Sequence, residues 1–350
     1  MIPLQEYLDL PLKERFIKLD KAEEERADEL YEKFIAIELH SHILLDEDFI
    51  VPRIKNSGIN GFFEAVAAIN ENFHDSMDTL GYLLNRTIKH PDFVPAFRAR
   101  DFRKAKDEGK QAIMFQLEPQ TFGNDLDRVN IAYGLGIRMA LLSFNTRTYA
   151  GDGCGERTNQ GLSYFGLDLV ERMNKVGMMI DLSHVGIQTT LDVIEASKHP
   201  VLANHVGARE LYKQSKRLKT DEELKAIAEK GGLIGVSAIP NQLSGEEKQS
   251  IDDLLNHVEY IVDLIGVEHV GIGLDNVFED QVEYHRQAAK SIFKLEHTGQ
   301  ELNAPYMWGI ESPEEWPNIV RGLVQRGYSD QEIEKIIGIN ALKIIERVVG

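Results

Sequence analysis

Short apolar runs recur along the chain and alternate with segments of helical spacing. Continuous apolar runs of four to eight residues are typical of parallel strands that are buried on both faces. Eight mainly apolar runs indicate such strands, at residues 34–39, 58–63, 112–117, 138–143, 178–182, 201–203, 233–238 and 269–273, of which 201–203 is only three residues long. The pattern therefore predicts eight strands distributed over most of the chain.

Segments with helical periodicity lie between most of these runs, at residues 75–89, 102–108, 125–133, 167–176, 187–197, 221–230 and 251–265. Thr220 and Glu223 have the spacing of a capping box, and Gly177 follows a helix as a C-terminal cap. Eight strands alternating with helices predict an α/β fold, a (β/α)8 barrel of the TIM type. An open, doubly wound sheet is the competing interpretation. We expect a helical extension at residues 1–33 and one barrel domain at 34–350.

Composition narrows the class of protein. The 350 residues carry a formal charge of −18, which argues against nucleic acid or an anionic membrane as a partner. The single cysteine, Cys154, excludes an intramolecular disulfide and fits a reducing compartment. The N-terminus lacks the apolar core of a signal peptide. These features predict a cytoplasmic protein.

Histidines and carboxylates follow five of the predicted strands at their carboxyl ends. Because parallel strands end on one face of a barrel, we expect these side chains to meet there. His40 and His42 are two residues apart, so both rings can approach one metal ion. The candidate set is His40, His42, Glu118, His184, His205 and Asp275.

Imidazole and carboxylate groups are the ligands that Zn²⁺, Mn²⁺ and Fe²⁺ accept in proteins. A bridging carboxylate such as Glu118 can hold two divalent ions that share a hydroxide, and Asp275 can then move the proton. The set predicts a two-metal hydrolase. The other histidines, at positions 74, 90, 199, 257, 269, 285 and 297, are interpreted as structural or surface residues.

Longer motifs carry a resemblance to a known family. The most specific are Gly151-Asp152-Gly153-Cys154, Asp181-Leu182-Ser183-His184-Val185-Gly186 and Gly271-Ile272-Gly273-Leu274-Asp275. With these motifs the chain, from about residue 34 to its end, resembles the renal (membrane) dipeptidase family of zinc metallopeptidases, in its bacterial branch and within the amidohydrolase superfamily. The resemblance implies a distorted barrel with two zinc ions, a dipeptide substrate and a homodimer.

The resemblance also implies roles for individual residues. His40 and His42 would bind the first metal, Glu118 would bridge, and His184 and His205 would bind the second. Asp275 would be the acid/base residue. Arg217 matches the arginine that holds the carboxylate of the substrate, and a planar two-pronged cation suits that task.

Two positions depart from the family pattern. His42 stands where the family has aspartate, and Asn145 stands where characterised dipeptidases have a histidine that faces the substrate. Asparagine can still donate a hydrogen bond to an oxyanion, so Asn145 stays a candidate substrate-binding residue. These departures leave open a cyclic amide, a lactam or an N-acyl amino acid as substrate. A metal-dependent phosphoesterase and a non-catalytic metal-binding barrel are further alternatives.

Overall fold

A computed structural model of the chain describes residues 17–42, 50–66, 72–118, 122–275, 298–299 and 303–350. Its main sheet is entirely parallel and runs in the order β1-β2-β4-β5-β6-β7-β8-β10, with β3 paired to β4 outside this path. The strands are β1 Ile37–Ser41, β2 Gly61–Ala65, β3 Phe93–Pro95, β4 Gln111–Leu117, β5 Met139–Leu141, β6 Met179–Asp181, β7 Leu202–Val206, β8 Leu233–Val236 and β10 Val270–Ile272.

The first and last strands of this path approach each other, so the sheet is a nearly closed barrel. The backbone N–H of Asp275, just after β10, donates to the carbonyl of His40 in β1 over 3.2 Å. A barrel of eight parallel strands confirms the predicted fold class and excludes the open doubly wound sheet. All eight predicted strands are present, with ends that differ by at most three residues.

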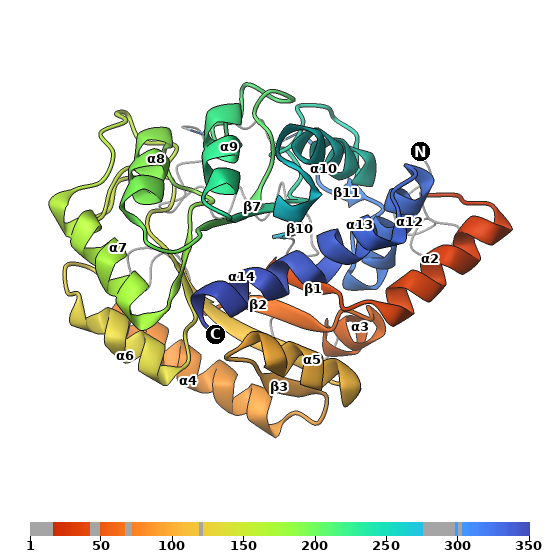
Figure 1. The fold of residues 1–350 in the computed structure, drawn as a ribbon, viewed down its shortest axis with the longest axis horizontal. Helices are drawn as coiled ribbons and strands as arrows, with labels where there is room; N and C mark the ends of the chain where they lie inside the picture. Colours follow the sequence, from red (N-terminus) through yellow and green to blue (C-terminus); the bar gives the residue numbers. More distant parts are fainter. Residues whose placement is uncertain (1–16, 43–49, 67–71, 119–121, 276–297, 300–302) are drawn as a thin grey trace.

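Most of the described helices lie on the outer side of the barrel (Figure 1). The helices are α2 Lys21–Lys33, α3 Ile50–Asn56, α4 Phe73–Lys89, α5 Ala99–Asp107, α6 Asp127–Leu135, α7 Tyr164–Val176, α8 Ile187–Ala196, α9 Asp221–Glu229, α10 Ile251–Ile265, α12 Pro317–Gln325, α13 Asp330–Glu334 and α14 Asn340–Val348. Short 3₁₀ turns lie at Val267–His269 and Pro313–Glu315, and a π-helical turn, Lys335–Ile339, joins α13 to α14. The predicted capping box of α9 forms, since Thr220 accepts from the N–H of Glu223. None of the described helices is both long and apolar enough to cross a membrane.

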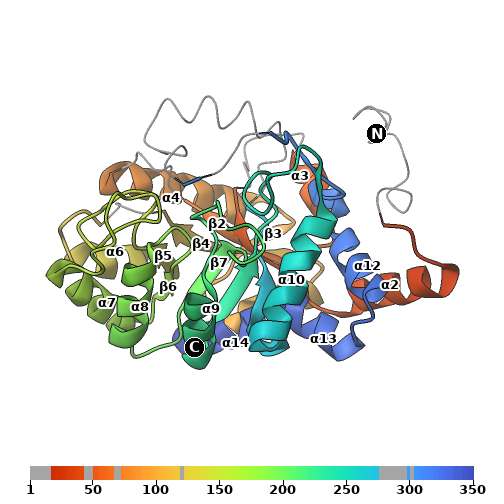
Figure 2. The same cartoon turned by 90° about the horizontal axis from the view of Figure 1, so that it is seen from above.

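The C-terminal helix closes the amino end of the barrel. Leu342, Ile345 and other apolar residues of α14 pack in one buried cluster with Met139, Met179 and Leu202, which begin their strands. Figure 2 shows α14 at the opposite end of the strands from the loop that follows β7. The amino end is therefore filled with side chains, and the carboxyl end is left for a polar site.

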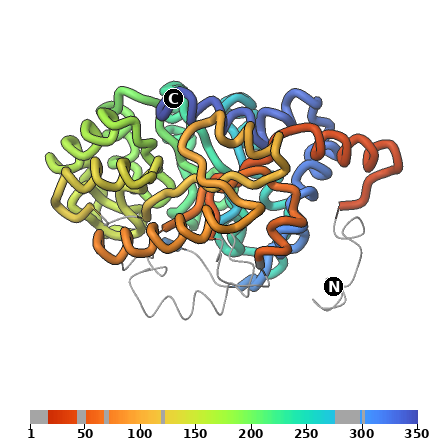
Figure 3. Tube along the Cα trace, turned by 90° about the horizontal axis from the view of Figure 1, so that it is seen from below, coloured from red at the N-terminus to blue at the C-terminus, as the bar shows by residue number. Residues whose placement is uncertain are grey.

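The N-terminal helix α2 lies beside α12, as Figures 1 and 3 both show at the red end of the chain. Arg321 of α12 donates to Glu24 of α2 and to the carbonyl of Ile17. Arg26 pairs with Asp330 at 2.7 Å. These contacts join segments that are about 300 residues apart in sequence. The division into an extension at 1–33 and a barrel at 34–350 stays a prediction.

A second, two-stranded parallel sheet pairs β9 Gln249–Ser250 with β11 Met307–Trp308.

Candidate metal centre

The six predicted metal-site residues all lie at the carboxyl end of the barrel. His40 is in β1 and His205 in β7, while the other four follow β1, β4, β6 and β10 within three residues. The pairing register shifts between Glu38 and Ser41 in β1 and between Ala203 and Val206 in β7. Such irregularities redirect side chains and are common beside active sites. Here they fall at the two histidines that lie within strands.

Three of these residues form a compact group. His40, His42 and Asp275 each offer a ligand atom, and these atoms lie within 4.8 Å of one another. His40 Nε2 is 3.2 Å from His42 Nε2, and Asp275 Oδ1 is 3.2 Å from His42 Nε2 and 3.5 Å from His40 Nε2. His40 and Asp275 are buried, whereas the side chain of His42 is 34% exposed. The predicted His-X-His pair therefore does direct both rings to one point.

The remaining three residues continue this group. Glu118 Oε1 is 3.5 Å from His40 Nε2, and Asp275 Oδ2 is 3.8 Å from His205 Nε2. The rings of His40 and His205 have centroids 3.9 Å apart, and those of His184 and His205 are 4.9 Å apart. The structure thus brings all six residues together. Their individual roles as ligands or as acid/base stay predictions.

Burial and mutual charge set the protonation of the centre. Burial raises the pKa of Glu118 to about 8. Burial also disfavours the charged forms of Asp275 and His42, but each stabilises the charge of the other. As a result the pKa of His42 rises to about 9, and the neighbouring imidazoles hold the pKa of Asp275 below its ordinary value. Asp275 is therefore an ionised carboxylate at neutral pH.

Asp275 also has an unusual backbone conformation. Its φ angle is +55°, in the left-handed region that few residues other than glycine adopt. Aspartate tolerates this region better than most residues, and strained positions of this kind gather at functional sites. The turn aims the carboxylate at His40 and His42 immediately after β10 ends.

Glu38, a buried acidic residue that the sequence analysis did not identify, stabilises the backbone next to His40 and Asp275. Glu38 Oε1 accepts from the backbone N–H of Leu274 at 2.6 Å and from that of His40 at 3.2 Å, and Oε2 accepts from Trp316 Nε1 at 3.0 Å. Glu38 therefore ties β1 to the end of β10. The sequence signal that could have identified Glu38 is its position two residues before His40, which places both side chains on the same face of the strand.

The two predicted substrate-binding residues are buried beside the centre. Arg217 donates to the backbone carbonyl of Ser183 and, over 3.5 Å, to that of His205. Asn145 Oδ1 lies 3.0 Å from His184 Nδ1. Asn145 thus contacts a candidate metal ligand directly. Contact of either residue with a substrate stays a prediction.

The centre fits divalent metal ions. His205 Nε2 is buried and has no hydrogen-bond partner among the described residues, and it is directed into a group that otherwise holds imidazoles and carboxylates. Ring nitrogens together with carboxylate oxygens are the donors that zinc and other borderline divalent ions prefer. A bound cation would also lower the cost of burying Glu118 and Asp275 together.

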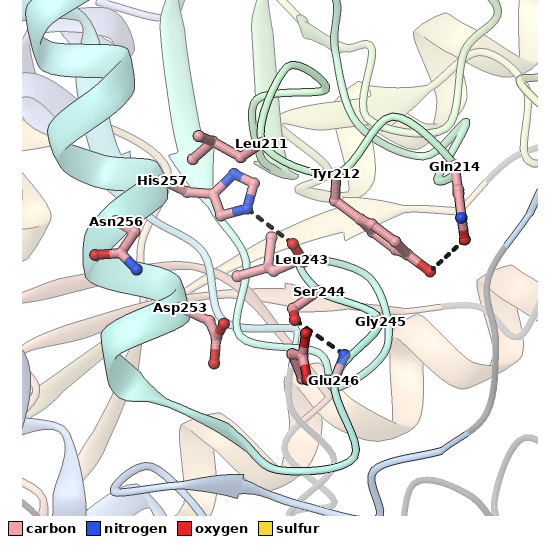
Figure 4. A pocket seen from close by; sticks show the side chains of 10 residues that line it. All are labelled: Leu211, Tyr212, Gln214, Leu243, Ser244, Gly245, Glu246, Asp253, Asn256 and His257. Atoms are coloured by element: carbon pink, nitrogen blue, oxygen red, sulfur yellow. Dashed lines mark hydrogen bonds between the residues drawn. The ribbon is translucent and has the colours of Figure 1, made fainter.

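A separate cavity of about 500 Å³ lies between the loops that follow β7 and β8 (Figure 4). It is lined by Tyr212, Leu243, Glu246 and His257, among others. His257 Nδ1 accepts from the N–H of Ala208 at 2.9 Å, and Nε2 donates to the carbonyl of Leu243 at 3.0 Å. Because both ring nitrogens are used, His257 is structural, as predicted. Another of the histidines set aside, His269, contacts the carbonyl of Gly232, and His285 and His297 lie outside the described residues.

Curated proteins are similar to this chain in sequence. The chain is 28% identical to dipeptidase tcpJ of Claviceps purpurea over 83% of its own length and 63% of that protein. It is 27% identical to the uncharacterized dipeptidase C965.12 of Schizosaccharomyces pombe over 72% of its own length and 55% of that protein. The chain therefore spans between half and two thirds of the length of these curated relatives.

Solved structures agree with the barrel. An amidohydrolase from Pseudomonas aeruginosa superposes with a TM-score of 0.82 at 28% identity, covering 93% of this chain and 99% of the other. Dipeptidase AC, a metallopeptidase of family M19, has a TM-score of 0.76 at 21% identity, covering 91% and 99%. The model of the membrane dipeptidase family, peptidase family M19, matches residues 24–294. The chain belongs to the membrane dipeptidase family of metallopeptidases.

Proposed function

We propose that the chain is a hydrolase with two divalent metal ions, most consistent with zinc, that cleaves the amide bond of a dipeptide. The observation that carries this proposal is the convergence of four histidines and two carboxylates at the carboxyl end of the barrel. A metallopeptidase from Rhodobacter sphaeroides with the same fold, at a TM-score of 0.75 and 20% identity over 90% of this chain and 99% of that one, was solved with a phosphinate mimic of the dipeptide L-Ala-D-Ala.

His40 and His42 would hold the first metal beside Asp275, His184 and His205 would hold the second, and Glu118 would lie between them. When bound, the two cations would polarise the carbonyl of the substrate and lower the pKa of water. The compact grouping of His40, His42 and Asp275 supports the first of these positions.

Asp275 would act as the acid/base residue. Because its pKa is low, Asp275 is ionised at neutral pH and has a free oxygen, Oδ1 or Oδ2, that can accept a proton from the attacking water. It would then pass that proton to the departing amine nitrogen. Arg217 would attract the carboxylate of the dipeptide, since the hydrogen bonds that its buried guanidinium makes to described residues go to the backbone carbonyls of Ser183 and His205 and leave its charge unpaired by them.

A panel of dipeptides, including members with a C-terminal D-residue, tests the proposal on zinc-loaded protein before and after chelation. We expect turnover that chelation abolishes, and a loss of at least ~100-fold in kcat for Asp275→Asn with the metal content unchanged. Metal-loaded protein that cleaves no dipeptide would overturn the substrate assignment.

A cyclic amide, lactam or N-acyl amino acid is the second candidate substrate, because His42 and Asn145 depart from the family pattern. The same panel extended to those amides decides between them. A cytoplasmic location and a homodimer remain predictions from the sequence.

A further inference from the structure

Asp181 and Ser183 belong to the motif that ends in His184, but the proposed function uses only the histidine of that motif. Asp181 is the last residue of β6 and is buried, and Ser183 follows it two residues later and is fully buried. Their side chains lie between the ends of β6 and β7, the strands that lead to His184 and carry His205. Each of these two strands therefore provides one of the histidines proposed for the second metal position.

A single oxygen atom, Asp181 Oδ1, connects the two strand ends. It accepts from the backbone N–H of Ser183 over 3.2 Å, which is the Asx-turn contact of an aspartate with the second residue after it. That turn leads the chain from β6 into His184. The same oxygen accepts over 3.0 Å from the backbone N–H of Asn204, the residue before His205 in β7. One atom therefore fixes the backbone beside each histidine.

The Ser183 hydroxyl makes a second connection. It donates to Asp181 Oδ1 over 2.7 Å and accepts from the backbone N–H of His205 over 3.1 Å. In a regular strand consecutive N–H groups point to opposite neighbours, whereas the N–H groups of Asn204 and His205 both point to these two side chains. They lie where the register of β7 shifts. The side chains thus replace backbone acceptors at an irregularity that redirects His205.

Backbone pairing contributes little to the spacing of these strand ends. β6 and β7 share one pair of aligned residues, Asp181 and Leu202, which lies at the start of β7 and before the histidine. Past this pair, side chains join the two strand ends on both kinds of backbone group. Asp181 and Ser183 bind the N–H groups, and Arg217 donates to the carbonyls of Ser183 and His205. The spacing at the level of the histidines therefore depends on side chains.

We propose that Asp181 and Ser183 are positioning residues that set the spacing of His184 and His205. The inference rests on the proposed two-metal site, because these histidines are the candidate ligands of its second position. Their ring centroids lie 4.9 Å apart. A metal site has to be held within ~0.5 Å of its productive geometry, so a small shift of either strand end weakens binding. Asp181 and Ser183 hold the candidate ligands in place and are not ligands themselves.

Ser183→Ala tests this inference. The variant removes the acceptor of the His205 N–H and one of the three donors at Asp181 Oδ1. Chelator-treated wild-type protein and the variant are titrated with Zn²⁺ by calorimetry. We expect two equivalents of zinc in the wild type. In Ser183→Ala one equivalent should bind as in the wild type and the other about 10–100-fold more weakly, the size of outer-partner effects on metal sites. Two unchanged equivalents would overturn the inference.

Ser57→Ala is the matched control. Ser57 is also fully buried, and its hydroxyl likewise donates to one oxygen and accepts from one backbone N–H, those of Ile54 and Ile59. It precedes β2 and so lies toward the amino end of the barrel, away from the candidate metal centre. The variant should lose stability while both zinc equivalents bind as in the wild type. Weakening of one equivalent in Ser57→Ala as well would attribute the effect to a general loss of stability and overturn the inference.

Asp181→Asn separates position from charge. Burial raises the pKa of Asp181 to about 6, so most of its carboxylate is ionised at neutral pH. Asparagine keeps an acceptor oxygen for the N–H groups of Ser183 and Asn204 but carries no charge. A positioning role therefore predicts zinc affinities close to those of the wild type. Weaker zinc binding in Asp181→Asn together with unchanged binding in Ser183→Ala would assign the effect to charge and contradict the inference.

Crystal structures of chelator-treated wild-type protein and Ser183→Ala give a readout that needs neither metal nor activity. We expect the separation of the His184 and His205 rings to differ between the two proteins by more than ~0.5 Å. An unchanged separation would refute the inference even in an active enzyme. A wild-type protein that binds no zinc would instead remove the proposed function, and the two structures would still decide whether Ser183 sets the spacing of the histidines.

Discussion

Replacing Glu38 by glutamine tests the hydrogen bonds that connect β1 to Leu274, after the end of β10, and to Trp316. Glutamine keeps one oxygen for the backbone N–H groups of Leu274 and His40, but its amide nitrogen must then face Trp316 Nε1. Two donors would meet at the 3.0 Å that now separates an acceptor from a donor. Burial raises the pKa of Glu38 to about 8, so the variant loses one hydrogen bond without losing a charge, and it leaves a buried indole N–H without an acceptor.

The magnitude follows from those two losses. A hydrogen bond to a neutral group contributes ~0.5–1.5 kcal/mol, and leaving a buried donor without an acceptor costs ~1–3 kcal/mol; the two figures overlap in part. We therefore expect Glu38→Gln to lower the free energy of unfolding by about 1–3 kcal/mol. Trp316 is fully buried and stacks on Tyr31 at 5.8 Å, so Trp316→Phe has a packing cost of its own.

A double-mutant cycle separates these effects. Trp316→Phe removes the N–H that collides with the new amide, while its packing cost is the same with either residue at position 38. The double variant should be less destabilised than the sum of the single variants, by about 1–2 kcal/mol. Urea unfolding followed by circular dichroism, on chelator-treated protein, measures all four free energies. Strict additivity would refute the assigned hydrogen bond.

Three further predictions concern other residues. Arg217→Ala should raise KM strongly with a smaller change in kcat, because the substrate carboxylate loses its cation; an unchanged KM in steady-state kinetics would remove this role. Asn145→Ala should weaken zinc binding by roughly 10–100-fold in a calorimetric titration, because His184 loses its Nδ1 partner at 3.0 Å, whereas a residue that contacts only substrate would leave zinc affinity unchanged. Burial lowers the pKa of His257 to about 4, so the unfolded chain binds an extra proton between about pH 6.5 and 4, and stability should fall by about 3 kcal/mol across that window as the pH drops. The same fall should be missing in His257→Gln, and equal pH slopes of unfolding free energy in both proteins would contradict it.

Much of the fold was predictable because buried parallel strands leave a strong pattern in the sequence. Continuous apolar runs located all eight barrel strands. The extra strand β3, Phe93–Pro95, is only three residues long and contains proline, so it carries no such pattern. Helix α3 was also missed, since its seven residues include a proline at position 52.

The site was predictable as far as it depends on single strand ends. His40, His42 and Asp275 each follow a recognisable run, and barrel topology alone brings them together. The hydrogen bonds that join Glu38 to Leu274 and to Trp316 connect residues 236 and 278 positions apart. No local pattern encodes that geometry, so these supporting residues emerged only from the structure.

An anomalous difference map, recorded at the zinc absorption edge from crystals of zinc-loaded protein, tests the central claim most directly. The account predicts two peaks at the carboxyl end of the barrel, one bonded to His40 and His42 and the other to His184 and His205, with Glu118 between them. A single peak, or peaks bonded to other residues, would contradict the two-metal centre.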